Sequence, residues 1–119
     1  MQDYKSLLVW KKAHQFTLKI YKLVASFPKE ETYNLTSQIK RSSSSIGTNI
    51  AEGCGRFTQK DFANFLQIAL GSSHELEYQI LLAKDLNFID VSAYTELEKE
   101  VGEIKAMLIL LIKKVRLAP

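Results

Sequence analysis

Apolar residues recur every three or four positions along nearly the whole chain, and this spacing constrains the fold more than any other feature. In the first segment, Trp10, Ala13, Ile20 and Val24 form such a series, and lysines fall away from it. A repeat of this kind places the apolar side chains along one face of an α-helix. The spacing predicts a helix over about residues 6–26, and no part of the sequence has the alternating pattern typical of a β-strand.

The same spacing predicts three further helices, over about residues 34–52, 58–87 and 91–115. Four helices with short connections are typical of an all-α, antiparallel up-and-down four-helix bundle. The 119 residues are enough for one core but too few for two. We therefore expect a single domain over residues 1–119.

Local signals mark the ends of these helices. Pro28 separates the first two, because the residue before a proline is disfavoured in the α conformation. Gly53 and Gly55 end the second helix, where a glycine is expected to take the left-handed conformation of a C-cap. Thr58 is expected to cap the third helix, and residues 87–90 are expected to form a tight turn.

The second helix carries small residues at four-residue spacing. Ser43, Gly47 and Ala51 form a line with almost no side chain. Such a line allows a neighbouring helix to approach closely. We interpret it as a packing surface.

More apolar side chains are present than one small bundle can bury. Residues 107–112 are apolar on every side of the fourth helix, and Ile68, Leu81 and Leu82 lie off the main apolar face of the third. A helix that is apolar all round is normally buried all round. A homo-oligomer is therefore expected, with the third and fourth helices supplying much of its interface.

The longest apolar run, residues 106–112, has seven residues, whereas crossing a bilayer takes about 20. No secretory signal is visible near the N-terminus. We therefore expect no membrane association and a cytoplasmic location. Cys54 is the only cysteine, which excludes an internal disulfide and a multi-cysteine zinc site.

The sequence offers no catalytic constellation, so an enzyme is not expected, and neither is a cofactor. His14 and His74 are the only histidines, too few for a typical zinc site. The serines at 42–45 lie in mid-helix without a visible base. Cys54 follows a helix whose negative end raises a thiol pKa. We therefore predict no catalytic residues and no metal site.

The segment from Gly53 to Arg56 leaves two interpretations open. Free backbone N–H groups, the start of a helix and an arginine can together hold a phosphate. The alternative is a turn between two helices that needs glycine for its geometry, and we favour it.

Lys and Arg outnumber Asp and Glu in residues 1–60, and the reverse holds in residues 61–119. Clustered cations favour a polyanionic partner, and a phosphate backbone suits such a surface. The candidate contact residues for RNA or DNA lie mainly on the first two helices: Lys11, Lys12, Lys19, Lys40, Arg41, Arg56 and Lys60. The alternative is that a basic helical hairpin packs beside an acidic one. No aromatic ladder is interleaved with these positions, so we expect binding to be directed by shape or backbone rather than by base identity.

Several motifs together resemble the bacterial four-helix-bundle family of proteins encoded by 23S rRNA intervening sequences. The resemblance covers about residues 4–115. Its motifs are Val9-Trp10-Lys11-Lys12-Ala13-His14, Ile20-Tyr21, Phe27-Pro28, residues 35–42, Ser45-Ile46-Gly47-Thr48-Asn49-Ile50-Ala51-Glu52-Gly53, residues 62–70 and Glu75-Leu76-Glu77.

This resemblance implies a ring-like homopentamer. Relatives include accessory proteins of diversity-generating retroelements, whose basic surfaces are associated with nucleic acid and with a reverse transcriptase. The resemblance carries over no catalytic residue. The family pattern maps onto Asn49, Glu52, Gly53 and Arg56, and for Asn49 and Glu52 we favour a role in capping or inter-helix hydrogen bonding over ligand contact. Two functions stay open: an oligomeric protein that binds RNA or DNA, or a scaffold that binds a protein partner.

Overall fold

The computed structural model describes residues 2–118 and contains four long helices. These are α1 (Leu8–Val24), α2 (Leu35–Cys54), α3 (Gln59–Asp85) and α4 (Val91–Leu117). Two short 3-10 helices precede α1 and α2, η1 (Tyr4–Ser6) and η2 (Lys29–Glu31). No strand occurs in the described residues, and the prediction of an all-α chain with four helices is confirmed.

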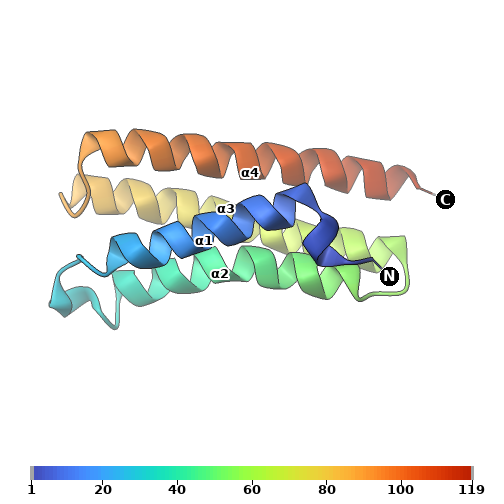
Figure 1. The fold of residues 1–119 in the computed structure, drawn as a ribbon, viewed down its shortest axis with the longest axis horizontal. Helices are drawn as coiled ribbons and strands as arrows, with labels where there is room; N and C mark the ends of the chain where they lie inside the picture. The colour runs from blue at the N-terminus through green and yellow to red at the C-terminus, as the bar shows by residue number, and fades with distance from the viewer. Residues whose placement is uncertain (1, 119) are drawn as a thin grey trace.

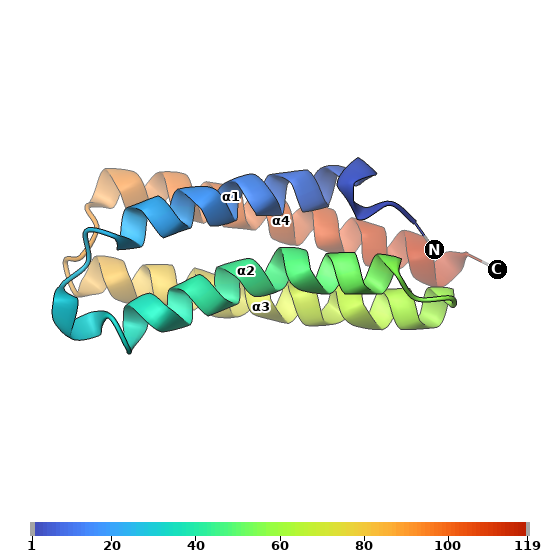
Figure 2. The same ribbon diagram turned by 60° about the horizontal axis from the view of Figure 1, so that its bottom comes forward.

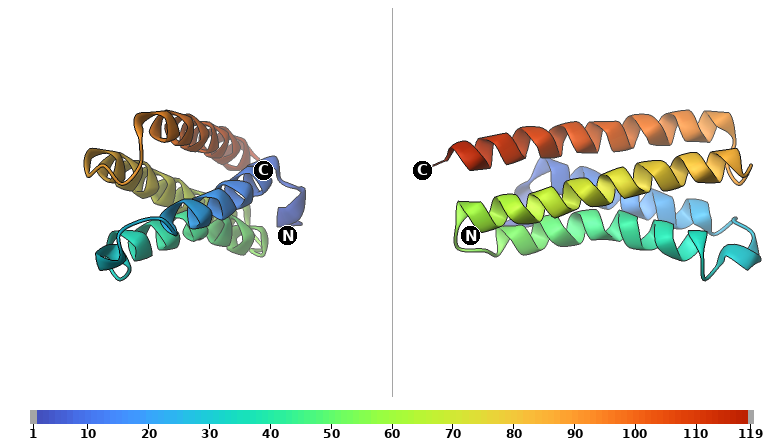
Figure 3. Two further views of the ribbon diagram at one scale, coloured as in Figure 1. Left: turned by 60° about the vertical axis from the view of Figure 1, so that its left-hand side comes forward. Right: turned by 180° about the vertical axis from the view of Figure 1, so that it is seen from behind.

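The helices lie side by side along a rod with extents of 48 × 24 × 19 Å. Consecutive helices run in opposite directions, and both termini lie at one end of the rod (Figure 1). Figure 2 looks onto α1 and α2, with α4 behind α1 and α3 behind α2. Seen from behind, α3 lies between α2 and α4 (Figure 3). The seam between α1 and α4 is the least closely packed of the four.

Each helix contributes its apolar face to one core. The largest buried aliphatic side chains come from all four helices: Ile20, Ile39, Ile46, Ile50, Leu66, Leu76, Ile80, Ile104 and Leu108. Burying an aliphatic side chain of this size contributes about 1.5–3 kcal/mol. Tertiary packing therefore stabilises α2, although its serine-rich middle is a poor helix former.

Two members of the small-residue line of α2, Ser43 and Gly47, lie next to α1. The hydroxyl of Thr17 donates hydrogen bonds to the carbonyl oxygens of Ala13 and Ser43, both at 2.9 Å. A Cβ on Gly47 would lie 3.4 Å from Nε1 of Trp10. The stripe therefore brings the two helices close enough for a side chain of one to reach the backbone of the other.

The end of α2 differs from the expectation. The helix continues to Cys54, and Gly55 has a φ of −85°, so no left-handed glycine C-cap is present. Gly53 serves a different purpose, because a Cβ there would lie 2.9 Å from both Cδ1 of Phe62 and Cβ of Phe65. Glycine allows the start of α3 to approach α2 closely.

The other helix boundaries follow local chemistry. The side chain of Thr58 accepts a hydrogen bond from the backbone N–H of Asp61, as expected for an N-cap. Asp90 caps α4 in the same way through Ala93. Between α3 and α4, Asn87 has a φ of 65°, a conformation that asparagine tolerates better than most residues. This turn is consistent with the one predicted over residues 87–90.

The apolar surplus on α4 is only partly used by the core. Leu108 and Ile112 are buried, Met107 and Leu111 are half-buried, and Ile109 and Leu110 are exposed. The segment is therefore not buried on every side within one chain. Across residues 2–118, none of the helices is long and apolar enough to cross a membrane.

Candidate nucleic-acid interface

The outer side of α1 and α2 is unusual in its charges. The sequence has no Asp or Glu in residues 4–29 or 32–51, and the only acidic residue of α2 is Glu52. The two helices carry several lysines and Arg41 over the same length. The charged side chains that α1 and α2 supply before Glu52 are therefore all cationic.

Two of the predicted contact residues are already paired with α4. The Nζ atom of Lys12 lies 3.3 Å from Glu103, and that of Lys19 lies 3.0 Å from Glu96 and 2.7 Å from Glu100. Hydrogen bonds to Glu100 and Glu96 raise the pKa of Lys19. For these two lysines, the arrangement is that of a basic helix packed beside an acidic one.

Three predicted residues remain on the α1–α2 side. Lys11 and Arg41 are exposed, and neither forms an ion pair with another residue in the described part of the chain. Lys40 is half-buried, with Nζ 5.3 Å from the centre of the Tyr21 ring on α1. This is within the range of a cation–π contact. Lys11, Lys40 and Arg41 therefore keep their charges available on one hairpin.

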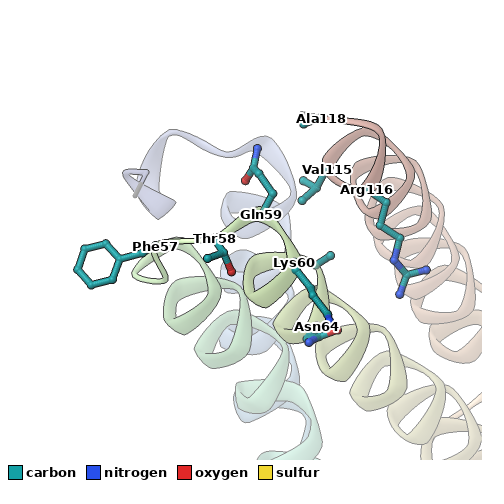
Figure 4. A pocket seen from close by; sticks show the side chains of 9 residues that line it. Phe57, Thr58, Gln59, Lys60, Asn64, Val115, Arg116 and Ala118 are labelled. Carbon is teal, nitrogen blue, oxygen red and sulfur yellow. The ribbon is translucent and has the colours of Figure 1, made fainter.

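Arg56 and Lys60 lie elsewhere, at the end of the bundle where α3 begins. The guanidinium carbon of Arg56 is 4.5 Å from the centre of the Phe65 ring. Lys60 lines a pocket of about 730 Å³ together with Arg116 of α4, a cation that the sequence analysis did not single out. Figure 4 shows Lys60 and Arg116 on neighbouring helices and Phe57 pointing away from them.

Two backbone N–H groups of the turn before α3 are already used in hydrogen bonds within the chain. The backbone N–H of Gly55 donates to the carbonyl of Glu52, and that of Arg56 donates to the carbonyl of Gly53, both at 3.1 Å. These donors complete the end of α2. The favoured interpretation, a helix-to-helix turn, agrees with this geometry.

The structure also places aromatic rings on the α1–α2 side, which the sequence analysis did not anticipate. The rings of Trp10 and His14 stack with centroids 4.9 Å apart, and the ring of Tyr4 meets Trp10 at 67° and 4.9 Å. The four-residue spacing of Trp10 and His14 on one helix was the available signal. Tyr4 lies outside the predicted helix, so only the fold brings it to Trp10.

Asn49 and Cys54, which the sequence analysis also singled out, lie in surroundings that suit a structural role. Asn49 donates hydrogen bonds to Ser45 within α2, to its carbonyl at 2.8 Å and its hydroxyl at 3.0 Å. Cys54 is buried, and burial, more than the nearby Asp3, raises the pKa of its thiol. Among residues 2–118, no group of three His, Cys, Asp or Glu side chains converges to hold a metal.

Residues 5–110 match the family model described as the 23S rRNA-intervening sequence protein. The chain belongs to this family. A solved member of the S23 ribosomal protein family, a Bacteroides thetaiotaomicron protein of unknown function, is 32% identical with a TM-score of 0.80. The match covers 89% of the 119-residue chain described here and 99% of the Bacteroides chain. No curated protein matches the chain.

Proposed function

We propose that this family member is a non-enzymatic, oligomeric protein that binds RNA or DNA through phosphate contacts on the α1–α2 hairpin. The observation that carries the proposal is the absence of carboxylates over residues 4–29 and 32–51, which contain Lys11, Lys40 and Arg41. Arg56 and Lys60 form a second group at the start of α3. Lys12 and Lys19 are left out of the contact set, because acids of α4 compensate their charges.

The expected interaction is electrostatic and therefore depends on salt. Each phosphate that a lysine or arginine neutralises releases bound counterions, so affinity falls as the salt concentration rises. A contact set of this size gives a slope of several units in a plot of log affinity against log salt concentration. Sequence preference is expected to be weak, because phosphates carry no direct sequence information.

Self-association is part of the proposal. Leu8 at the start of α1 and Leu110 on α4 are exposed, and they line one apolar groove with Met107 and Leu111. A second copy would cover this surface. An oligomer would also repeat the basic hairpin, and linked copies bind a long polyanion more tightly than one copy does.

A protein-interaction scaffold is the alternative. Ile68 and Tyr78 on α3 are 51% and 61% exposed among the described residues. Under this alternative the lysines of α1 and α2 only keep the surface hydrated and contact no nucleic acid. Recovery of a protein partner after nuclease treatment would support it.

Fluorescence anisotropy with a structured RNA and a DNA duplex, from low to physiological salt, tests the main proposal. Lys40→Glu and Arg41→Glu should each weaken binding. Lys99→Glu makes the same charge change at an exposed position on α4 and serves as the control. Equal affinities for all three variants would exclude the α1–α2 surface. No binding of either nucleic acid at low salt would exclude structured RNA and duplex DNA as ligands.

A further inference from the structure

A shallow groove runs between α1 and α2 beside the stacked rings of Trp10 and His14. It has a volume of about 350 Å³, and it is lined by Tyr4, Trp10, His14 and small residues of α2 that include Gly47. Trp10 and His14 are nearly parallel, with 8° between their planes. His14 is exposed and lines the groove, so its ring can be reached by a ligand there.

Gly47 keeps the groove open. A Cβ at this position would lie 3.4 Å from Nε1 of Trp10, and a longer side chain would fill the space in front of the indole. Nε1 of Trp10 forms no hydrogen bond with any atom of residues 2–118. Every buried polar side-chain atom in this range does have a hydrogen-bond partner, so Nε1 is not buried. The indole N–H is therefore a solvent-accessible donor at the edge of the groove.

Two lysines near the groove favour an anionic ligand over a cationic one. The ammonium of Lys5 lies 5.9 Å from the centre of the Tyr4 ring, and that of Lys40 lies 5.3 Å from the centre of the Tyr21 ring. Gly47 and Lys40 are seven residues apart on α2, or about 10 Å along the helix. Lys5 and Lys40 therefore lie near the groove, beyond the residues that line it.

We propose that this groove binds an unpaired base of a single-stranded nucleic acid, which stacks on His14 while neighbouring phosphates contact Lys40 and Lys11. Aromatic rings next to cations are the combination that single-strand binding uses, and stacking tolerates any base. A duplex cannot use the site, because its bases are already stacked on one another. The inference rests on the proposed function and adds to it a preference for single strands.

The test compares a short unstructured DNA strand with the same strand annealed to its complement, by anisotropy at low salt. The single strand should bind more tightly and should change the emission of Trp10, the only tryptophan. His14→Ala should weaken single-strand binding about fivefold or more, as expected for the loss of one stacked base. It should leave duplex binding unchanged.

Two matched controls are available. His74→Ala removes the other exposed histidine, on α3, and should change neither affinity. Gly47→Leu should block the groove and weaken single-strand binding, whereas Gly71→Leu, at a position with nothing within 4 Å of a Cβ, should not. Circular dichroism identifies any variant that fails to fold, and His14→Ala tests the site independently of Gly47→Leu.

The outcomes separate this inference from the proposed function. Equal single-strand affinity in His14→Ala and His74→Ala would overturn the stacking site, while salt-dependent binding that Arg41→Glu weakens would leave the proposed function standing. Equal affinity of the original protein for the strand and its duplex would also overturn the stacking site. Absence of binding to the strand, to its duplex and to the structured RNA would overturn both.

Discussion

The backbone of Gly53 lies so close to Phe65 that a Cβ on Gly53 would be 2.9 Å from the Cβ of Phe65 and equally close to Cδ1 of Phe62. Gly53 is itself buried near the end of α2, where α3 turns back against it. The atoms that such a Cβ would meet belong to the ring of Phe62 and to the Cβ of Phe65, and neither is the far end of a flexible side chain. This approach fixes how the α2–α3 hairpin closes.

Gly53→Ala is therefore expected to destabilise the protein. Forcing an extra methyl group into a packed site costs about 1–3 kcal/mol, which outweighs the usual helix preference for alanine. Gly71→Ala is the control, because nothing lies within 4 Å of its Cβ, and it should stabilise α3 by about 0.5–1 kcal/mol. Urea unfolding measures both changes, and equal signs for the two variants would contradict the packing argument.

Ser42→Ala should also lower the free energy of unfolding. The Ser42 hydroxyl donates to Oε1 of Gln79 at 2.6 Å, and both residues are buried. Removing the donor leaves a buried amide oxygen without this partner, at a cost of about 1–3 kcal/mol. Ser44→Ala is the matched control, since Ser44 donates only to the carbonyl of Arg41 in its own helix. A similar unfolding midpoint for the two variants would show that the bond to Gln79 contributes little.

Tyr94 should ionise at unusually high pH. Its hydroxyl donates to Glu98 at 2.6 Å, and this hydrogen bond raises the pKa of Tyr94 to about 12. Because the folded pKa lies above the ordinary value near 10, the interaction stabilises the fold below about pH 10 and is lost as the pH rises towards 12. Tyrosinate absorbance should show one late titration that Tyr94→Phe removes. Persistence of that titration in the variant would assign it to another tyrosine.

Leu110→Glu should reduce self-association. Leu110 is 64% exposed in the apolar groove between α1 and α4, and a carboxylate in a covered apolar interface is strongly unfavourable. Light scattering after size-exclusion chromatography should show a smaller particle for Leu110→Glu than for the original protein. Leu18→Glu, at an exposed leucine outside that groove, should keep the original mass. An unchanged mass for Leu110→Glu would place the interface elsewhere.

The sequence by itself determined the four helices, because the signals that form and end a helix are local. The apolar spacing, the cap at Thr58 and the turn at residues 87–90 all act over a few residues. The described helices agree with the predicted ones to within about two residues at each end. The expected glycine C-cap was wrong. Gly53 is instead packed against Phe62 and Phe65 on the next helix, and local spacing does not reveal such a contact.

Only the tertiary structure decided which charged and aromatic groups share a surface. Lys12 and Lys19 resemble Lys11 in the sequence, yet acids of α4 far along the chain pair with the first two. Lys11 forms no ion pair with any residue from 2 to 118. Tyr4 joins Trp10 and His14 only because η1 folds back onto α1. Helix formation depends on neighbours within a few residues, whereas the composition of a surface depends on how whole helices pack against one another.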